Sequence, residues 1–180
     1  MSFARTLAAL TTGSLAACAS AAPPAADAPA APASAAYTPP TPFARLSSMV
    51  GTWRPADAPD STLRIHFSLT AGGTVLMESW ERAGKPHSLT LYHADGIRLL
   101  ATHYCPQGNQ PRLALASGYS GGPLHFAFRD ATDLDPAESH QHDLWFDFSD
   151  PKHPVRGEVY RAAGGLQPRE NLRLVRADAP

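Results

Sequence analysis

Alternation of apolar and polar residues with a period of two is the feature that most constrains how this chain can fold. Alternation over four to eight residues is typical of strands with one buried face. From Leu63 onward such runs follow one another, separated by Gly, Pro and Asp. The runs are Leu63–Leu69, Val75–Trp80, Leu89–Tyr92, Ile97–His103, Arg112–Ser117, Leu124–Phe128, Leu144–Phe148, Val155–Arg161 and Asn171–Arg176.

The turns between these runs predict how the strands are joined. Most connections are short, and Asp95-Gly96 is a strong signal for a two-residue hairpin. Tight turns imply antiparallel neighbours, and closure into a barrel removes exposed edges. We therefore expect an all-β domain, an antiparallel up-and-down barrel of about ten strands. A two-sheet sandwich is the alternative. Helical spacing over residues 43–50 predicts one short helix before the first strand.

The N-terminal part of the chain differs in composition. Residues 1–17 carry one early Arg and then small apolar residues, which is typical of a signal peptide. They end in Leu15-Ala16-Ala17-Cys18, which resembles the lipobox of bacterial lipoproteins. That resemblance implies acylation of Cys18 and, with Ala19 next, the periplasmic face of the outer membrane. The alternative is an ordinary signal peptide with Cys18 incidental.

Residues 18–42 are mostly Ala and Pro and contain almost no large apolar group. Such a segment cannot bury enough surface to offset its ordering entropy, so we expect a disordered tether. The folded domain is then residues 43–180. No apolar run of about 20 residues is present, so no membrane-spanning helix is expected.

The charge balance argues against nucleic acid as a partner. Lys and Arg total 15, Asp and Glu total 16, and the formal net charge is −1. A nucleic-acid-binding surface needs clustered Lys and Arg residues that neutralise phosphates. We expect the partners to be a membrane, through Cys18, and a small molecule.

The order of short helix, Gly51-Thr52-Trp53 and meander resembles the calycin superfamily, which contains lipocalins, fatty-acid-binding proteins and nitrobindin-type barrels. The resemblance covers residues 43–176 and implies that Trp53 packs at the closed end of a barrel. Segments 92–96, 102–105, 108–112 and the His140-Gln141-His142 triplet are also similar to uncharacterised lipocalin-like proteins from bacteria. Tyr160 stands where that group often has tryptophan.

The candidate site residues follow from strand phase. His103 and Cys105 share the phase of Leu99 and Ala101, and His140 and His142 share that of Leu144. Asn109 and Arg112 follow the end of the His103 strand. Apolar walls with a few polar groups are typical of a ligand pocket. The predicted ligand-binding residues are therefore His103, Cys105, Asn109, Arg112, His140 and His142, with no catalytic or metal-binding residue assigned.

Several roles stay open for these side chains. Imidazoles two residues apart on a strand lie about 7 Å apart, so both can reach one metal ion or polar ligand. A single imidazole can bind haem iron, as in the nitrobindin-type barrels. His103 can equally be a hydrogen-bonded core residue, Cys105 an inert buried thiol, and Arg112 a surface cation. No cofactor is assigned.

Three classes of function follow. The first is a membrane-anchored barrel that binds a small, mostly apolar ligand. The second is a hydrolase or isomerase on the same scaffold, with a histidine as base and Cys105 as nucleophile. The third is an envelope accessory protein that acts through its outer surface. The expected polar groups inside the barrel favour the first two classes over the third, and the first is the prediction.

Overall fold

The structure, a computed structural model, describes residues 40–178. The predictions on the signal peptide, on Cys18 and on most of the Ala/Pro segment lie outside the described residues. Within residues 40–178 the elements are α1 (Pro42–Ser47), β1 (Gly51–Pro55), β2 (Leu63–Thr70), η1 (Ala71–Gly73), β3 (Val75–Arg82), β4 (Lys85–Asp95), β5 (Arg98–Tyr104), β6 (Gln110–Leu115), β7 (Leu124–Thr132), β8 (His140–Asp147), β9 (Val155–Ala162), β10 (Gly165–Leu166) and β11 (Glu170–Arg176).

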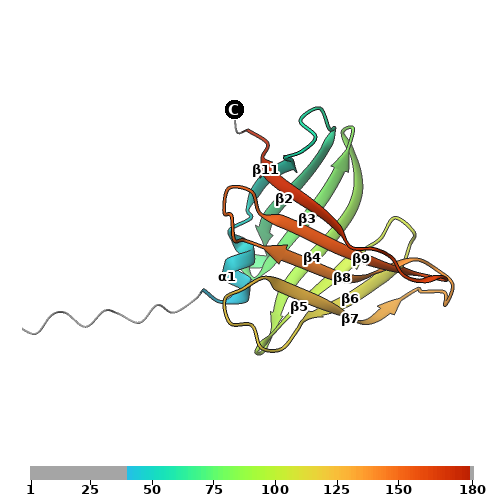
Figure 1. The fold of residues 1–180 in the computed structure, drawn as a ribbon. Coiled ribbons are helices and arrows are strands. Elements are labelled where there is room, and N and C mark those ends of the chain that lie inside the picture. Colours follow the sequence, from blue (N-terminus) through green and yellow to red (C-terminus); the bar gives the residue numbers. More distant parts are fainter. Residues whose placement is uncertain (1–39, 179–180) are drawn as a thin grey trace, which may run out of the picture. The chain divides into compact units, whose positions relative to one another are not determined.

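The strands form a closed antiparallel barrel (Figure 1). In the described part of the chain, β1 to β8 pair in sequence order, β8 pairs with β9, and β11 lies between β9 and β1. These ten strands close the barrel, and the short β10 pairs with β9 beside it. The predicted all-β barrel is confirmed, and the alternative sandwich is wrong.

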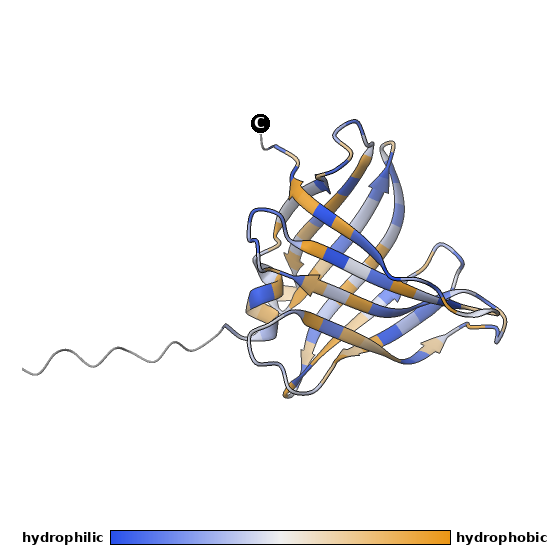
Figure 2. Ribbon diagram, viewed as in Figure 1, coloured by the Kyte–Doolittle hydropathy of each residue, from blue (hydrophilic) through white to orange (hydrophobic). Residues whose placement is uncertain are grey.

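The period-two pattern positions the core. Apolar and polar residues alternate along the strands in Figure 2, and the apolar set points inward. Aromatic rings fill much of the interior: Phe146 packs edge-on against Phe67 and Tyr92, with ring centroids 6.2 and 6.0 Å apart. We call this region the apolar core; its fully buried members include Ile65, Leu76, Tyr92, Leu113, Leu124, Phe126, Leu144 and Phe146.

One end of the barrel is closed by α1 and the residues that follow it. The Thr41 side chain caps α1 by accepting from the Ala44 N–H at 3.2 Å. The helix ends at Ser47, earlier than the predicted residue 50, because the chain must turn into β1 at Gly51, whose φ is 126°. Buried Trp53 donates its indole N–H to the Met49 carbonyl at 2.6 Å, and the Arg176 guanidinium lies 4.1 Å from its ring centroid.

The hairpin between β4 and β5 differs from the sequence prediction by one residue. Asp95 pairs with Arg98, so the two loop residues are Gly96 and Ile97 rather than Asp95 and Gly96. Gly96 takes a φ of 60° at the first loop position, where glycine is favoured in type II′ turns. Ile97 is consequently fully exposed and does not extend the inward row of His103.

Candidate functional site

Polar side chains replace apolar ones in part of the barrel interior. The pairs Phe67–Glu78, Glu78–Thr90 and Thr90–His103 form a row across β2, β3, β4 and β5. On β9, Arg156 and Glu158 lie two residues apart on the same face of the strand. The Arg156 guanidinium contacts Glu78 of this row. We call the following residues the polar cluster: Glu78, Thr90, His103, Gln141, Arg156 and Glu158. All except Glu158 are buried, and Glu158 is partly buried.

Arg156 connects the two sides of the polar cluster. Its Nε lies 2.6 Å from Glu78 Oε1, at an angle unsuited to a hydrogen bond, so this contact is ionic. Its Nη1 donates to Glu158 Oε2 at 2.7 Å. Burial alone would lower the pKa of Arg156, but the two carboxylates outweigh it and raise the pKa. In the same way Arg156 outweighs the burial of Glu158 and lowers its pKa. Both side chains are therefore charged.

Glu78 is the most completely enclosed carboxylate in this group. Trp80 Nε1 donates to its Oε1 at 2.6 Å, and the Tyr92 hydroxyl donates to its Oε2. Burial and the negative charge of Glu78 raise the pKa of Tyr92, so the hydroxyl stays protonated as a donor. These bonds and Arg156 together satisfy a carboxylate that would otherwise be very costly to bury.

His103 is held at one ring nitrogen and free at the other. Its Nδ1 lies 2.9 Å from Thr90 Oγ1. Its Nε2 is buried, and among the described residues it has no hydrogen-bond partner. Burial, with a smaller contribution from the positive charge of Arg156, lowers the pKa of His103 to about 4. The imidazole is therefore neutral at physiological pH.

Gln141 presents a second free atom. Its Nε2 donates to Glu158 Oε2 at 2.9 Å, which fixes the orientation of the amide because a carboxylate only accepts. Its Oε1 is buried and has no partner within residues 40–178. Tyr160 pairs with Gln141 across β8 and β9, and burial followed by the charge of Glu158 raises the pKa of its hydroxyl.

Cys105 and Asn109 lie at the turn between β5 and β6. The Cys105 thiol donates to the Gln107 side chain, and burial raises its pKa. A raised pKa keeps the thiol protonated, which is the opposite of what a nucleophilic cysteine needs. Buried Asn109 donates to the Ser139 carbonyl at 3.0 Å and ties this turn to the start of β8, while its Oδ1 has no partner among the described residues.

The remaining three predicted site residues lie away from the polar cluster. Arg112 is half exposed and pairs with Asp130 on the neighbouring strand β7, so the structure does not place it with the cluster. A bulge at His142 shifts the register of β8. As a result buried Gln141, and not a histidine, contacts Glu158.

His140 and His142 instead both contact Phe128, with ring centroids 4.9 and 5.4 Å apart. The Nδ1 of His142 lies 2.8 Å from Asp143, which also binds His125 Nε2 at 2.7 Å. The buried Nε2 of His140 has no partner in the described part of the chain. The predicted set therefore separates into four groups: His103 in the cluster, Cys105 and Asn109 at the adjoining turn, Arg112 paired with Asp130, and His140 with His142 against Phe128.

Two small cavities open beside the polar cluster. One of about 150 Å³ is lined by residues of β2, β3, β9 and β11, including Trp80, Arg156 and Glu158. The other, of about 250 Å³, is lined by Glu158, Tyr160, Gln167, Pro168 and Glu170. Glu158 and Glu170 line both. Arg156 and Glu158 are therefore the members of the polar cluster that line these cavities next to β9, while His103 and Gln141 lie behind them.

These cavities also limit which cofactors fit. Both are smaller than the ~300 Å³ at which pockets for drug-sized ligands begin, and haem is larger than such ligands. Neither cavity therefore has room for haem, and His103 lines neither of them. Within residues 40–178, no group of three or more His, Cys, Asp or Glu side chains is arranged to hold a metal ion.

Sequence reasoning missed most of the polar cluster. Glu78 lies between Leu76 and Trp80 in the inward phase of its strand, and this was a usable signal. On β9, by contrast, Val155 and Val159 suggest the inward row, yet Arg156 and Glu158 occupy it. No family model and no curated protein sequence matches this chain. The closed barrel is consistent with a lipocalin-like fold, and this rests on the structure.

Proposed function

We propose that the barrel binds a small, mostly apolar molecule whose polar group contacts the polar cluster. The observation that carries this proposal is a set of two buried polar atoms, His103 Nε2 and Gln141 Oε1, that have no hydrogen-bond partner among residues 40–178. A buried polar atom without a partner costs about 1–3 kcal/mol. A ligand that supplies the missing hydrogen bonds recovers that free energy.

The chemistry of the cluster defines the ligand further. Gln141 Oε1 is an acceptor, because the amide nitrogen is already committed to Glu158. When His103 Nδ1 carries the proton toward Thr90, its Nε2 is an acceptor as well. Glu78, Arg156 and Glu158 together carry one net negative charge, which disfavours an anion. The ligand is therefore a neutral or cationic molecule with a hydroxyl or amino group that donates, and its apolar part lies against Leu63, Trp80 and Leu172.

The free-energy cost of burying the polar cluster supports a functional role for it. Replacing a buried ion pair by well-packed apolar residues is often neutral or stabilising. Stability alone does not require Glu78 and Arg156 inside this barrel, whose other interior positions are mostly filled by apolar side chains. Binding and orienting a ligand gives these residues a function.

Cellular location belongs to the same proposal. The sequence Leu15-Ala16-Ala17-Cys18 supports an acylated N-terminal cysteine and attachment to the periplasmic face of the outer membrane. The following Ala/Pro segment would act as a spacer between the lipid surface and the barrel. No helix within residues 40–178 is long and apolar enough to cross a membrane. In this setting the barrel would carry or sense its ligand without chemical conversion.

Native mass spectrometry tests the proposal. The chain from Ala19 to Pro180 is exported to the periplasm through a cleavable signal peptide, so that no acyl group competes for the site. We expect a retained small molecule that is released on denaturation. His103→Ala should lose it while keeping the fold, which circular dichroism checks. Arg112→Ala is the matched control, because Arg112 pairs with Asp130 away from the cluster, and it should retain the molecule. Equal retention by both variants would sink the assignment.

A further inference from the structure

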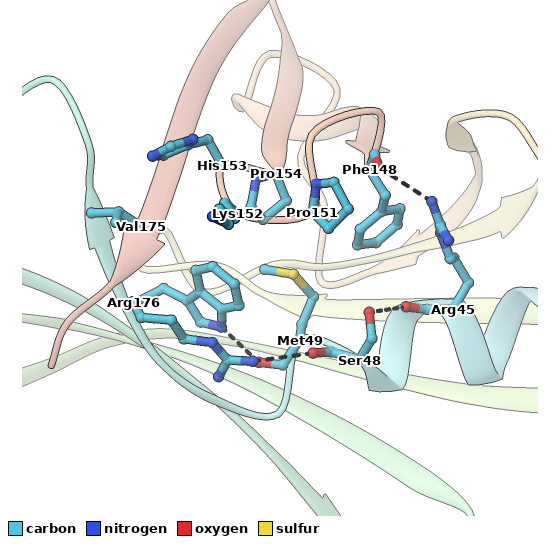
Figure 3. Close-up of a pocket in the computed structure, with 11 residues that line it drawn as sticks. Arg45, Ser48, Met49, Phe148, Pro151, Lys152, His153, Pro154, Val175 and Arg176 are labelled. Atoms are coloured by element: carbon cyan, nitrogen blue, oxygen red, sulfur yellow. Dashed lines mark hydrogen bonds between the residues drawn. The ribbon is translucent and has the colours of Figure 1, made fainter. Parts of the chain in front are cut away.

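A third and larger cavity lies at the closed end of the barrel, separate from the polar cluster. It has a volume of about 650 Å³, which is within the usual range for small-molecule sites. Figure 3 shows Pro151, Lys152, His153 and Pro154 of the β8–β9 loop on one side of it. Residues next to α1 lie on the other side. No residue of the polar cluster lines it.

The walls of this closed-end cavity are mostly apolar, and rings form much of them. They are formed largely by Met49, Trp53, Phe148, Pro151 and Pro154. The Arg176 guanidinium covers the Trp53 ring, and the Arg45 guanidinium lies 5.0 Å from the Phe148 ring centroid. Indole, phenyl and proline rings offer planar surfaces that stack well on a planar apolar body.

The charged residues that line the cavity are all of one sign. They are Arg45, Lys152 and Arg176, and no Asp or Glu lines it. Arg176 is engaged by the Val50 and Ser48 carbonyls at 2.6 and 3.3 Å. His153 is paired with Asp150 at 2.9 Å. These two side chains are therefore already engaged by other groups of the protein.

Lys152 and Arg45 each keep polar hydrogens that no group of residues 40–178 engages. The Lys152 ammonium is exposed and has no ion-pair partner among residues 40–178, and its backbone N–H binds Asp150 Oδ1 at 2.9 Å, which fixes the turn. Arg45 donates from Nη2 to the Phe148 carbonyl at 3.2 Å. Its buried Nε has no partner in the described part of the chain.

We propose that this closed-end cavity binds a small organic anion with a planar apolar body, such as an aromatic carboxylate. The apolar body lies between the prolines of the β8–β9 loop and the Arg176 guanidinium that covers Trp53, and the anionic group contacts Lys152 and Arg45. The site is independent of the polar cluster, and the two differ in the charge they select. The cluster disfavours anions, whereas this cavity requires one.

Titration followed by two-dimensional NMR tests the inference on the chain from Ala19 to Pro180. The probe is 2-naphthoate, and 2-naphthalenemethanol is its uncharged counterpart. We expect saturable shifts of the Met49, Phe148 and Lys152 amides, with binding of the alcohol about tenfold weaker. Absence of binding, equal affinity for both probes, or shifts centred on Glu158 and His103 would overturn the proposal.

The two lysines of the chain provide a matched pair of variants. Lys152→Glu reverses the charge at the cavity, whereas Lys85→Glu reverses it at the exposed β3–β4 turn. We expect Lys152→Glu to weaken 2-naphthoate binding by about threefold to tenfold and to leave the alcohol unaffected. Lys85→Glu should change neither. Equal losses in both variants would indicate nonspecific charge attraction and contradict the assigned site.

Discussion

The apolar core and the polar cluster occupy the same barrel and are built on the same strands, but they are stabilised in opposite ways. Phe146 packs ring against ring with Phe67 and Tyr92, although its cross-strand neighbour on β9 is the charged Arg156. Around Arg156, two carboxylates, a phenol and an indole satisfy one another. The apolar core contributes stability through burial. The polar cluster is tolerated because its groups are paired, and it leaves acceptor atoms for a ligand.

Removing the Glu78 carboxylate should destabilise the barrel strongly. Glu78→Ala leaves the buried Arg156 with only Glu158 as its counter-charge. We expect the free energy of unfolding to fall by about 3–5 kcal/mol, measured by urea denaturation.

Glu78→Gln is the matched control for that prediction. It keeps the side-chain volume and an acceptor for Trp80 but removes the charge, so most of the loss should persist. A small loss in Glu78→Gln beside a large one in Glu78→Ala would show that the cavity, and not the unpaired cation, causes the destabilisation.

The next largest effect should be a dependence of stability on pH that comes from the polar cluster and not from the apolar core. His103 has a pKa of about 4 when folded and 6.5 as a free side chain. Between these values the unfolded chain binds the proton and the folded chain does not. Stability is therefore full above pH 6.5 and falls as the pH drops toward about 4. The loss from this one group is about 3 kcal/mol.

Urea denaturation across this pH range in wild type and in two variants measures that contribution. His103→Asn should remove the His103 share of the pH dependence, whereas Phe146→Leu in the apolar core should lower stability equally at all these pH values. A wild-type pH dependence that His103→Asn leaves unchanged would contradict a buried neutral imidazole.

A change at the closed end should have the smallest effect. Trp53→Phe removes the indole donor to the Met49 carbonyl and weakens the contact with Arg176. We expect a loss of about 1–2 kcal/mol in the free energy of unfolding. The pKa of His103, followed by NMR titration, should not move. A shift in that pKa would show that the closed end and the polar cluster are coupled.

The sequence predicted the barrel well because strand alternation and turn residues are local signals. Along residues 63–67 and 124–126 the fold retains the period of two, whereas Leu69 is exposed and Phe128 is only partly buried. The candidate site was harder to predict, because a one-residue bulge at His142 changes which side chain contacts Glu158. A period-two count cannot locate such a bulge.

The charged residues inside the barrel were missed for a different reason. On β9 the apolar Val155 and Val159 alternate with Arg156 and Glu158, and hydrophobicity alone assigns the valines to the interior. The opposite arrangement holds because Glu78, adjacent in space but far away in sequence, pairs with Arg156. Only the barrel closure brings these partners together. His103 was predictable because its strand has no bulge.

A crystal structure of the chain from Ala19 to Pro180, purified from the periplasm with its bound molecules, tests the central claim most directly. The account predicts electron density of an organic molecule beside Glu158, with a donor group within hydrogen-bond distance of His103 Nε2 and Gln141 Oε1. Water alone at these two atoms, or a protein group bonded to both, would contradict a ligand site in the polar cluster.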